Sequence, residues 1–137
     1  MGAKCSYEVN ERGVALMKIN NPPMNALDEQ TMLELEFCLH KIQVDDTVKV
    51  VVITGEGGTF VVGADINKVQ NVNTREAGEI LTGRAHEIMN LIEFSSKPVI
   101  AAINGLCLGG GTELSMACHM RFISDQAQMG LPEIMLG

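Results

Sequence analysis

Two short runs of aliphatic residues restrict the folds open to this chain more than any other feature. "VKVVVITG" (48–55) and "KPVIAAING" (97–105) place β-branched and small apolar residues at nearly consecutive positions. Runs of this kind are typical of parallel strands that are buried on both faces. Parallel neighbours are joined by crossover connections, which are usually helices. We therefore expect an α/β fold with doubly buried strands, right-handed crossovers and ligands at the carboxyl ends of the strands.

The segments around these runs predict the other elements. Residues 7–23 predict a β-hairpin that turns at 11–13 and stops at Pro22 and Pro23. Asp28 is typical of a helix N-cap, and the helix after it has its apolar positions at Met32, Leu33, Leu35, Phe37, Leu39 and Ile42. We also expect a second helix over about 74–94, a short helix over about 112–118, and short strands at 59–62, 120–124 and 127–130.

Composition and charge exclude several classes of protein. The 137 residues are 46% hydrophobic, which argues for a packed core and against disorder. The net charge is −7 without a basic run, so nucleic acid and anionic membranes are poor candidates for partners. The longest apolar run, 98–108, is interrupted by Asn and Gly and is too short to span a bilayer.

Cysteine usage points to an intracellular protein. Cys5, Cys38, Cys107 and Cys118 form no C-x-x-C motif, so we interpret them as reduced thiols. The N-terminus lacks the apolar region of a signal peptide, which favours a cytoplasmic location. The pair Cys118-His119 favours packing and a helix end over metal binding, and we expect no metal site.

The stretch "GLCLGGGTELSMACH" (105–119) combines a strand, glycines and a helix start, an arrangement suited to holding an anion or oxyanion. It matches neither a dinucleotide-binding motif nor a P-loop, and no G-x-S-x-G nucleophile motif occurs in the chain. Backbone N–H donors beside a carboxylate, Glu113, remain. Two interpretations of Glu113 stay open from the residues alone: a catalytic acid, or a charge that favours the helix N-terminus.

A second glycine turn, in "TFVVGADI" (59–66), follows another short apolar strand. Gly63 and Ala64 are small enough for the Ala64 N–H to face a ligand. Paired with a donor near Gly110, it would form the two convergent N–H groups that an enolate or tetrahedral oxyanion requires. Asp65 is either a ligand contact or, the interpretation we favour, the cap of the next turn.

A third stretch, "GLPEIMLG" (130–137), places Glu133 directly after Pro132 and among Leu131, Ile134 and Leu136. Desolvation by apolar neighbours disfavours an ionised carboxylate, and a carboxyl group held protonated suits a general acid. The alternative is an exposed loop glutamate.

These stretches, taken in order with "NPPMNALD" and "KPVIAAINGLCLGGGTELSMACHMRFIS", resemble the crotonase (enoyl-CoA hydratase/isomerase) superfamily over nearly the whole chain. The resemblance implies a spiral of ββα units that binds acyl-CoA thioesters. It implies that the N–H groups of Ala64 and Gly110 form the oxyanion hole and that Glu113 and Glu133 are catalytic. The substrate-binding positions that it implies are Met24, Ala26, Val62, Gly63, Asp65, Ile66, Leu106, Gly109 and Pro132.

The same resemblance implies an enoyl-CoA hydratase of fatty-acid or related acyl-CoA degradation. Glu113 would deprotonate a water that adds at C3 of a 2-enoyl-CoA, and Glu133 would deliver a proton to C2. No cofactor is expected, since coenzyme A enters with the substrate. The presence of both glutamates favours hydration over the isomerisation of the same family. A non-catalytic acyl-CoA-binding or assembly module is the remaining alternative.

Two departures from the family pattern give further expectations. The compact "NPPMNAL", with "ACHMR" and "GLPE", resembles the hydratase half of multifunctional β-oxidation proteins. The family's domain continues into C-terminal helices that close the acyl pocket and build trimers, or dimers of trimers, and these helices are absent from residues 1–137. We expect an incomplete acyl-CoA-binding core that exposes apolar surface near 134–136 and forms homo-oligomers.

Overall fold

The strands form two sheets whose order follows the order of the chain. The computed structural model describes residues 2–63 and 73–136. A five-stranded sheet, the large sheet, has the order β1-β2-β3-β5-β7, and a three-stranded sheet, the small sheet, has the order β4-β6-β8. The elements are β1 (Cys5–Val9), β2 (Val14–Ile19), α1 (Glu29–Val44), β3 (Val50–Gly55), β4 (Thr59–Val62), α3 (Arg75–Glu93), β5 (Val99–Ile103), β6 (Leu106–Leu108), α4 (Gly110–Ala117), β7 (Met120–Ile123), β8 (Met129–Gly130) and the 3₁₀ helix η1 (Pro132–Leu136).

The N-terminal hairpin forms as the sequence predicts. β1 and β2 pair antiparallel, with Val9 opposite Ala15. Gly13 occupies the turn at φ 81°, in the left-handed region that favours glycine. A Cβ at this position would lie 2.7 Å from the Thr47 carbonyl oxygen, so the close approach of the loop before β3 also requires glycine.

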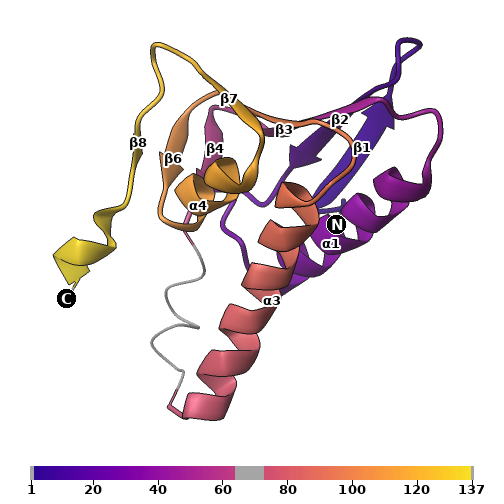
Figure 1. Cartoon of the computed structure of the whole chain (residues 1–137). Helices are drawn as coiled ribbons and strands as arrows, with labels where there is room; N and C mark the ends of the chain where they lie inside the picture. Colours follow the sequence, from indigo (N-terminus) through magenta and orange to yellow (C-terminus); the bar gives the residue numbers. More distant parts are fainter. Residues whose placement is uncertain (1, 64–72, 137) are drawn as a thin grey trace.

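A ββα unit recurs along the rest of the chain. Each unit contributes one strand to the large sheet, one to the small sheet, and then a helix: β3-β4-α3, β5-β6-α4 and β7-β8-η1. All pairings of β2 with β3, β3 with β5 and β5 with β7 are parallel, as are those within the small sheet. The units wind into a spiral with the two sheets at an angle to each other (Figure 1), which confirms the predicted α/β spiral.

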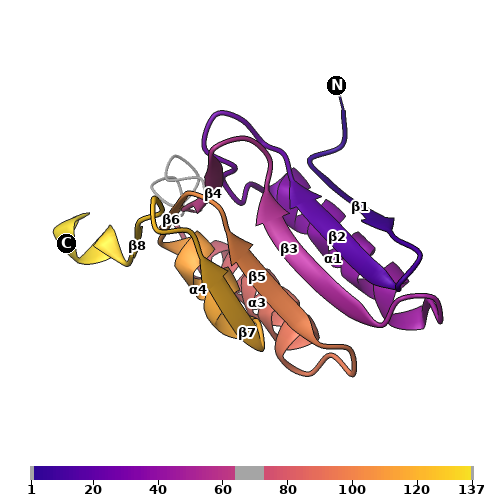
Figure 2. The same cartoon turned by 90° about the horizontal axis from the view of Figure 1, so that it is seen from above.

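The core lies between the large sheet and helices α1 and α3, which cover one face of that sheet (Figure 2). Met17, Ile53 and Ala101 point into it from three neighbouring strands and are fully buried. Leu35 of α1 and Ile92 of α3 meet them from the helices. Burial of these aliphatic side chains is the main force that holds the layers together.

The prediction that the two aliphatic strands are buried on both faces is wrong. In β3 and β5 buried residues alternate with half-buried ones, such as Val52 and Ile100. These side chains lie on the face opposite α1 and α3, the outer face, where the helices of the described chain do not reach (Figure 2). Leu16 and Phe122 extend the same face and are 38% and 61% exposed.

The predicted helix boundaries hold at α1 and α3. Asp28 caps α1, accepting hydrogen bonds from the backbone N–H (2.8 Å) and the hydroxyl (2.7 Å) of Thr31. Thr74 caps α3 in the same way, through the N–H of Ala77 at 3.2 Å. α4 begins at Gly110, two residues before the predicted start, because glycine backbone rather than a side-chain cap opens it.

Candidate active site

Two glycine turns lie side by side where β4 and β6 end. Gly63 follows β4, Gly109 follows β6, and both are left-handed, with φ of 71° and 56°. The Gly63 N–H donates to the Leu108 carbonyl at 2.9 Å. A Cβ built on Gly109 would lie 3.6 Å from the Gly63 Cα. The sequence predicted that these two turns converge, and the parallel pairing of β4 with β6 brings them together.

The N-terminus of α4 opens at this junction. The first backbone bond of the helix runs from the Glu113 N–H to the Gly109 carbonyl at 3.0 Å. Among residues 2–63 and 73–136, no acceptor is found for the Gly110 N–H. Gly111 seats the helix directly on β4, since a Cβ there would lie 2.8 Å from the Val61 carbonyl carbon. A free N–H at a helix N-terminus, where the dipole is positive, suits a developing negative charge.

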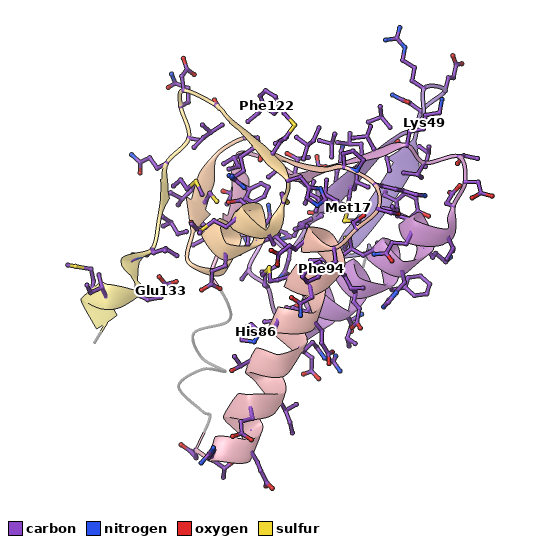
Figure 3. The ribbon with its side chains drawn as sticks, viewed as in Figure 1. Met17, Lys49, His86, Phe94, Phe122 and Glu133 are labelled. Carbon is purple, nitrogen blue, oxygen red and sulfur yellow. The ribbon has the colours of Figure 1, made fainter. Side chains whose placement is uncertain are left out.

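Glu133 reaches this junction from η1. Its Oε1 occupies the space that a Cβ on Gly109 would need, and its Cδ would lie 3.3 Å from that Cβ. Figure 3 shows the Glu133 side chain on the side of η1 that faces the rest of the molecule. The backbone conformation of Gly109 favours glycine, and a side chain at this position would also displace the Glu133 carboxylate.

The apolar enclosure predicted around Glu133 is not formed among the described residues. The Glu133 side chain is exposed, and Leu131 and Ile134 are 51% and 86% exposed. A 3₁₀ helix has three residues per turn, so consecutive side chains of η1 point in different directions and do not gather around one carboxylate. Glu113 is exposed as well, in the first turn of α4.

Residues 21–27 form a loop that is hydrogen-bonded to the end of β4 and to the Gly63 turn. The Val62 N–H donates to the Met24 carbonyl at 3.0 Å, and the Leu27 N–H donates to the Gly63 carbonyl at 3.1 Å. Met24 and the half-buried Ala26, both predicted substrate contacts, therefore lie beside the Gly63 turn.

Asn25 holds this loop in place, a role that was not among the predictions from the sequence. Its side chain is 2% exposed, and its Nδ2 donates toward the carbonyls of Glu56 (3.0 Å), Thr59 (2.9 Å) and Phe60 (3.3 Å). Its φ of 52° is left-handed. Asparagine is enriched in that region, so an Asn next to a double proline could have been recognised as a turn position.

The remaining predicted residues divide into two groups. Val62 ends β4, Leu106 begins β6, and Pro132 begins η1 as an exposed residue. Leu106 therefore lies at the far end of β6 from Gly109. Ala64, Asp65 and Ile66 lie outside the described residues, so the Ala64 donor and the two contacts stay predictions.

The four cysteines and His119 have structural surroundings: the thiols are buried, and the imidazole bonds to backbone groups. All four cysteines are free and buried. Burial raises the pKa of the Cys118 thiol to about 12, an effect that the nearby Arg121 guanidinium only partly offsets, so this thiol is a poor nucleophile. His119 accepts from the Val99 N–H through Nδ1 at 2.9 Å and lies 2.9 Å from the Glu93 carbonyl through Nε2. These bonds agree with the packing role predicted for the Cys118-His119 pair.

Residues 2–63 and 73–136 contain no cluster of three metal-ligating side chains. Within the same ranges no helix has the length and hydropathy needed to cross a membrane.

Comparison with known proteins places this geometry in a family. The family model described as enoyl-CoA hydratase/isomerase matches residues 9–137. A probable enoyl-CoA hydratase of Bacillus subtilis is 44% identical over 124 residues, which cover 90% of this chain and 48% of that protein. The fatty acid oxidation complex subunit alpha of Idiomarina loihiensis is 42% identical over 137 residues, covering 96% of this chain and 19% of that protein.

A solved structure shares the fold. The crystal structure of an enoyl-CoA hydratase/isomerase from Xanthobacter autotrophicus Py2 superposes with a TM-score of 0.90 and 31% identity, over 98% of this chain and 51% of that one. The chain thus spans about half, or less, of the length of the relatives that it matches.

Proposed function

Because the chain belongs to the enoyl-CoA hydratase/isomerase family, we propose that it supplies the catalytic core of an enoyl-CoA hydratase in fatty-acid or related acyl-CoA degradation. The reaction adds water across the C2–C3 double bond of a 2-enoyl-CoA thioester. The observation that carries the proposal is one cluster: the Gly110 N–H has no acceptor among residues 2–63 and 73–136, Glu133 lies against the neighbouring Gly109, and Glu113 lies in the same helical turn.

The chemistry assigns each group a task. Attack of water at C3 moves the C2–C3 π electrons into the thioester, and negative charge develops on the thioester oxygen. The Gly110 N–H, at the positive end of the α4 dipole, donates to that oxygen, and the Ala64 N–H is proposed as the second donor. Glu113 accepts the proton that the water loses, and Glu133 delivers a proton to C2. Atoms balance: one water is consumed, and C3 gains OH while C2 gains H.

The exposure of the two glutamates bears on how water reaches the site. Glu113 and Glu133 are both exposed, so a water molecule between them has access from bulk solvent. A general acid in water-filled surroundings works best once substrate binding excludes that water. We therefore propose that bound acyl-CoA, rather than the η1 side chains, provides the apolar cover over Glu133.

Two other functions compete with hydration. An isomerase of the same fold would move a proton between carbons and add no water. A non-catalytic acyl-CoA-binding or assembly module would bind the thioester without turnover, and the half-length match to the relatives keeps this alternative in view. Feeding a 3-enoyl-CoA and identifying the product distinguishes the isomerase, and isothermal titration with a saturated acyl-CoA distinguishes the binding module.

The proposal is tested with crotonyl-CoA, whose conjugated-enoyl absorbance disappears on hydration. Glu113→Gln and Glu133→Gln keep the shape of each side chain and should each lower kcat by about 10²–10⁴-fold, the usual contribution of a positioned acid or base. Glu11→Gln removes the same charge at the exposed hairpin turn and serves as the matched control. Full turnover by either site variant would refute the role of that residue.

We further propose a homo-oligomer, a trimer or a dimer of trimers, and a cytoplasmic location. Ile134 and Met135 are 86% and 83% exposed on η1, which supports association through that end of the chain. Four free and buried cysteines support a reducing compartment.

A further inference from the structure

A buried hydroxyl joins the two segments that carry the glutamates. Thr112 lies in the first turn of α4 and is 4% exposed. Its Oγ1 lies 2.7 Å from the Gly130 carbonyl of β8 and 3.0 Å from the Cys107 carbonyl of β6. A hydroxyl has one proton to donate, so the shorter distance favours the bond to Gly130.

The Gly130 carbonyl is the anchor of the C-terminal segment. It accepts a second hydrogen bond from the Gly109 N–H at 3.0 Å. β8 has only two residues, Met129 and Gly130, so few ladder bonds hold it to β6. Beyond it the chain runs out to η1 at the end of an extended arm (Figure 1). The side-chain bond from Thr112 is therefore a substantial part of what fixes this arm.

Each of the two residues joined by this bond lies close in sequence to one of the two glutamates. Glu113 is the next residue in α4, and Glu133 follows Gly130 by three residues. The hydroxyl thus ties the backbone of one glutamate to the backbone that leads to the other. A shift of β8 would therefore move Glu133 away from its place beside the start of α4, where Gly109, Gly110 and Glu113 lie.

We propose that Thr112 is a positioning residue for the hydration proposed above: its hydroxyl sets the separation of Glu113 and Glu133 by holding the Gly130 carbonyl. The inference rests on that proposed function for its catalytic part. Its structural part, the fixing of the arm, stands without it. Thr112 itself reaches no substrate, because it is buried beneath the first turn of α4.

The test compares variants that differ in one hydroxyl. Thr112→Val keeps the shape and loses the donor, whereas Thr112→Ser keeps the donor. Ser115→Ala is the matched control, because Ser115 is also buried in α4 but its hydroxyl bonds within the helix, to the Thr112 carbonyl at 2.7 Å. Each variant is assayed for kcat and KM with crotonyl-CoA. Amide hydrogen exchange is followed at Gly109, at residues 129–131 and at Glu133, since Pro132 has no amide hydrogen.

We expect Thr112→Val to lower kcat by about 10–100-fold with little change in KM, since misplacing a catalytic group by about 1 Å can cost about 10²-fold. Thr112→Ser should restore at least half of the wild-type kcat, and Ser115→Ala should leave kcat within about twofold. Exchange at residues 129–131 and at Glu133 should accelerate in Thr112→Val alone. If Thr112→Val does not fold, Thr112→Ala, which removes the hydroxyl without added bulk, replaces it.

Each other outcome has a distinct meaning. Wild-type kcat and unchanged exchange in Thr112→Val would overturn the inference. Equal losses in Thr112→Val, Thr112→Ser and Ser115→Ala would also overturn it, because they would reflect only the stability of α4. If the wild-type chain does not turn over crotonyl-CoA, the proposed function fails, and the exchange data alone then decide whether Thr112 fixes the arm.

Discussion

Replacing Gly109 by alanine separates backbone strain from displacement of a catalytic group. Gly109 has φ 56° and ψ −118°, a backbone conformation that favours glycine, and holding another residue in such a sparsely populated region costs about 1–3 kcal/mol. The new Cβ would also coincide with the Glu133 Oε1. Because Glu133 is an exposed and flexible side chain, it can move away at little cost in stability. The carboxylate must retreat by an amount on the order of 1 Å to restore an ordinary van der Waals contact.

The chain offers a matched control for the strain. Gly57 has φ 77°, and nothing lies within 4 Å of a Cβ built there. Gly57→Ala therefore carries the same kind of backbone penalty without the contact. Both variants should lose unfolding free energy, by about 1–3 kcal/mol each. Only Gly109→Ala should lose kcat, by about 10²-fold, because a 1 Å misplacement of a reacting group can cost that much.

The assays are chemical denaturation for stability and crotonyl-CoA hydration for kcat. If Gly109→Ala acts through Glu133, adding it to Glu133→Gln should lower kcat by less than the product of the two single effects. Wild-type kcat in Gly109→Ala would show that Glu133 does not act from its place against Gly109. An equal loss of kcat in Gly57→Ala would show that strain, rather than displacement, sets the activity.

Three further predictions concern stability and assembly. Asn25→Ala should cost about 3 kcal/mol of unfolding free energy by leaving buried carbonyls unpaired, with Asn25→Gly costing about 1 kcal/mol less because glycine tolerates φ 52°; a loss below about 1 kcal/mol in denaturation would contradict this. Burial opposes ionisation of Asp28, but hydrogen bonds from Lys4 and Thr31 outweigh it and lower its pKa from 3.8 to about 2. Unfolding free energy should therefore fall as pH drops from about 4 to 2, and Asp28→Asn, which still caps α1, should flatten that part of the pH profile. The chain should self-associate in sedimentation experiments, and Ile134→Asp should weaken association more than Ile80→Asp, whose side chain is also exposed at 73%; equal effects would place the interface elsewhere.

Local signals in the sequence were sufficient for most of the architecture. A capping aspartate at 28, a glycine turn at 13 and a proline stop at 22–23 each act within a few residues, and the hairpin and α1 follow from them. The convergence of the Gly63 and Gly109 turns also followed, since parallel strands end at the same edge. The hairpin and the helix cap depend on local backbone preferences, which a sequence pattern can report, whereas the convergence of the two turns depends on the parallel pairing of β4 with β6.

The features that the sequence did not predict depend on how distant parts of the chain pack together. Val52 and Ile100 belong to aliphatic runs, but hydrophobicity alone does not determine whether a second layer covers the outer face of the sheet. Glu133 has apolar neighbours in sequence, yet η1 turns Ile134 and Met135 outward. Asn25 bonds to carbonyls that lie 31 to 35 positions along the chain, and Thr112 bonds to Gly130, which lies 18 positions along the chain. No local pattern covers such separations.

The order of the large sheet has a consequence for how the chain folds during synthesis. Its strands lie side by side in the order β1-β2-β3-β5-β7, which is also the order in which a ribosome produces them. Each new strand therefore pairs with a strand that has already been synthesised. The first pair is the β1-β2 hairpin, which is antiparallel and needs no crossover connection. Parallel pairing is slow because the loop entropy is lost before the contacts form. Growth from a single edge limits that search to one partner at each step, so the sheet can form from its N-terminal side without waiting for later strands.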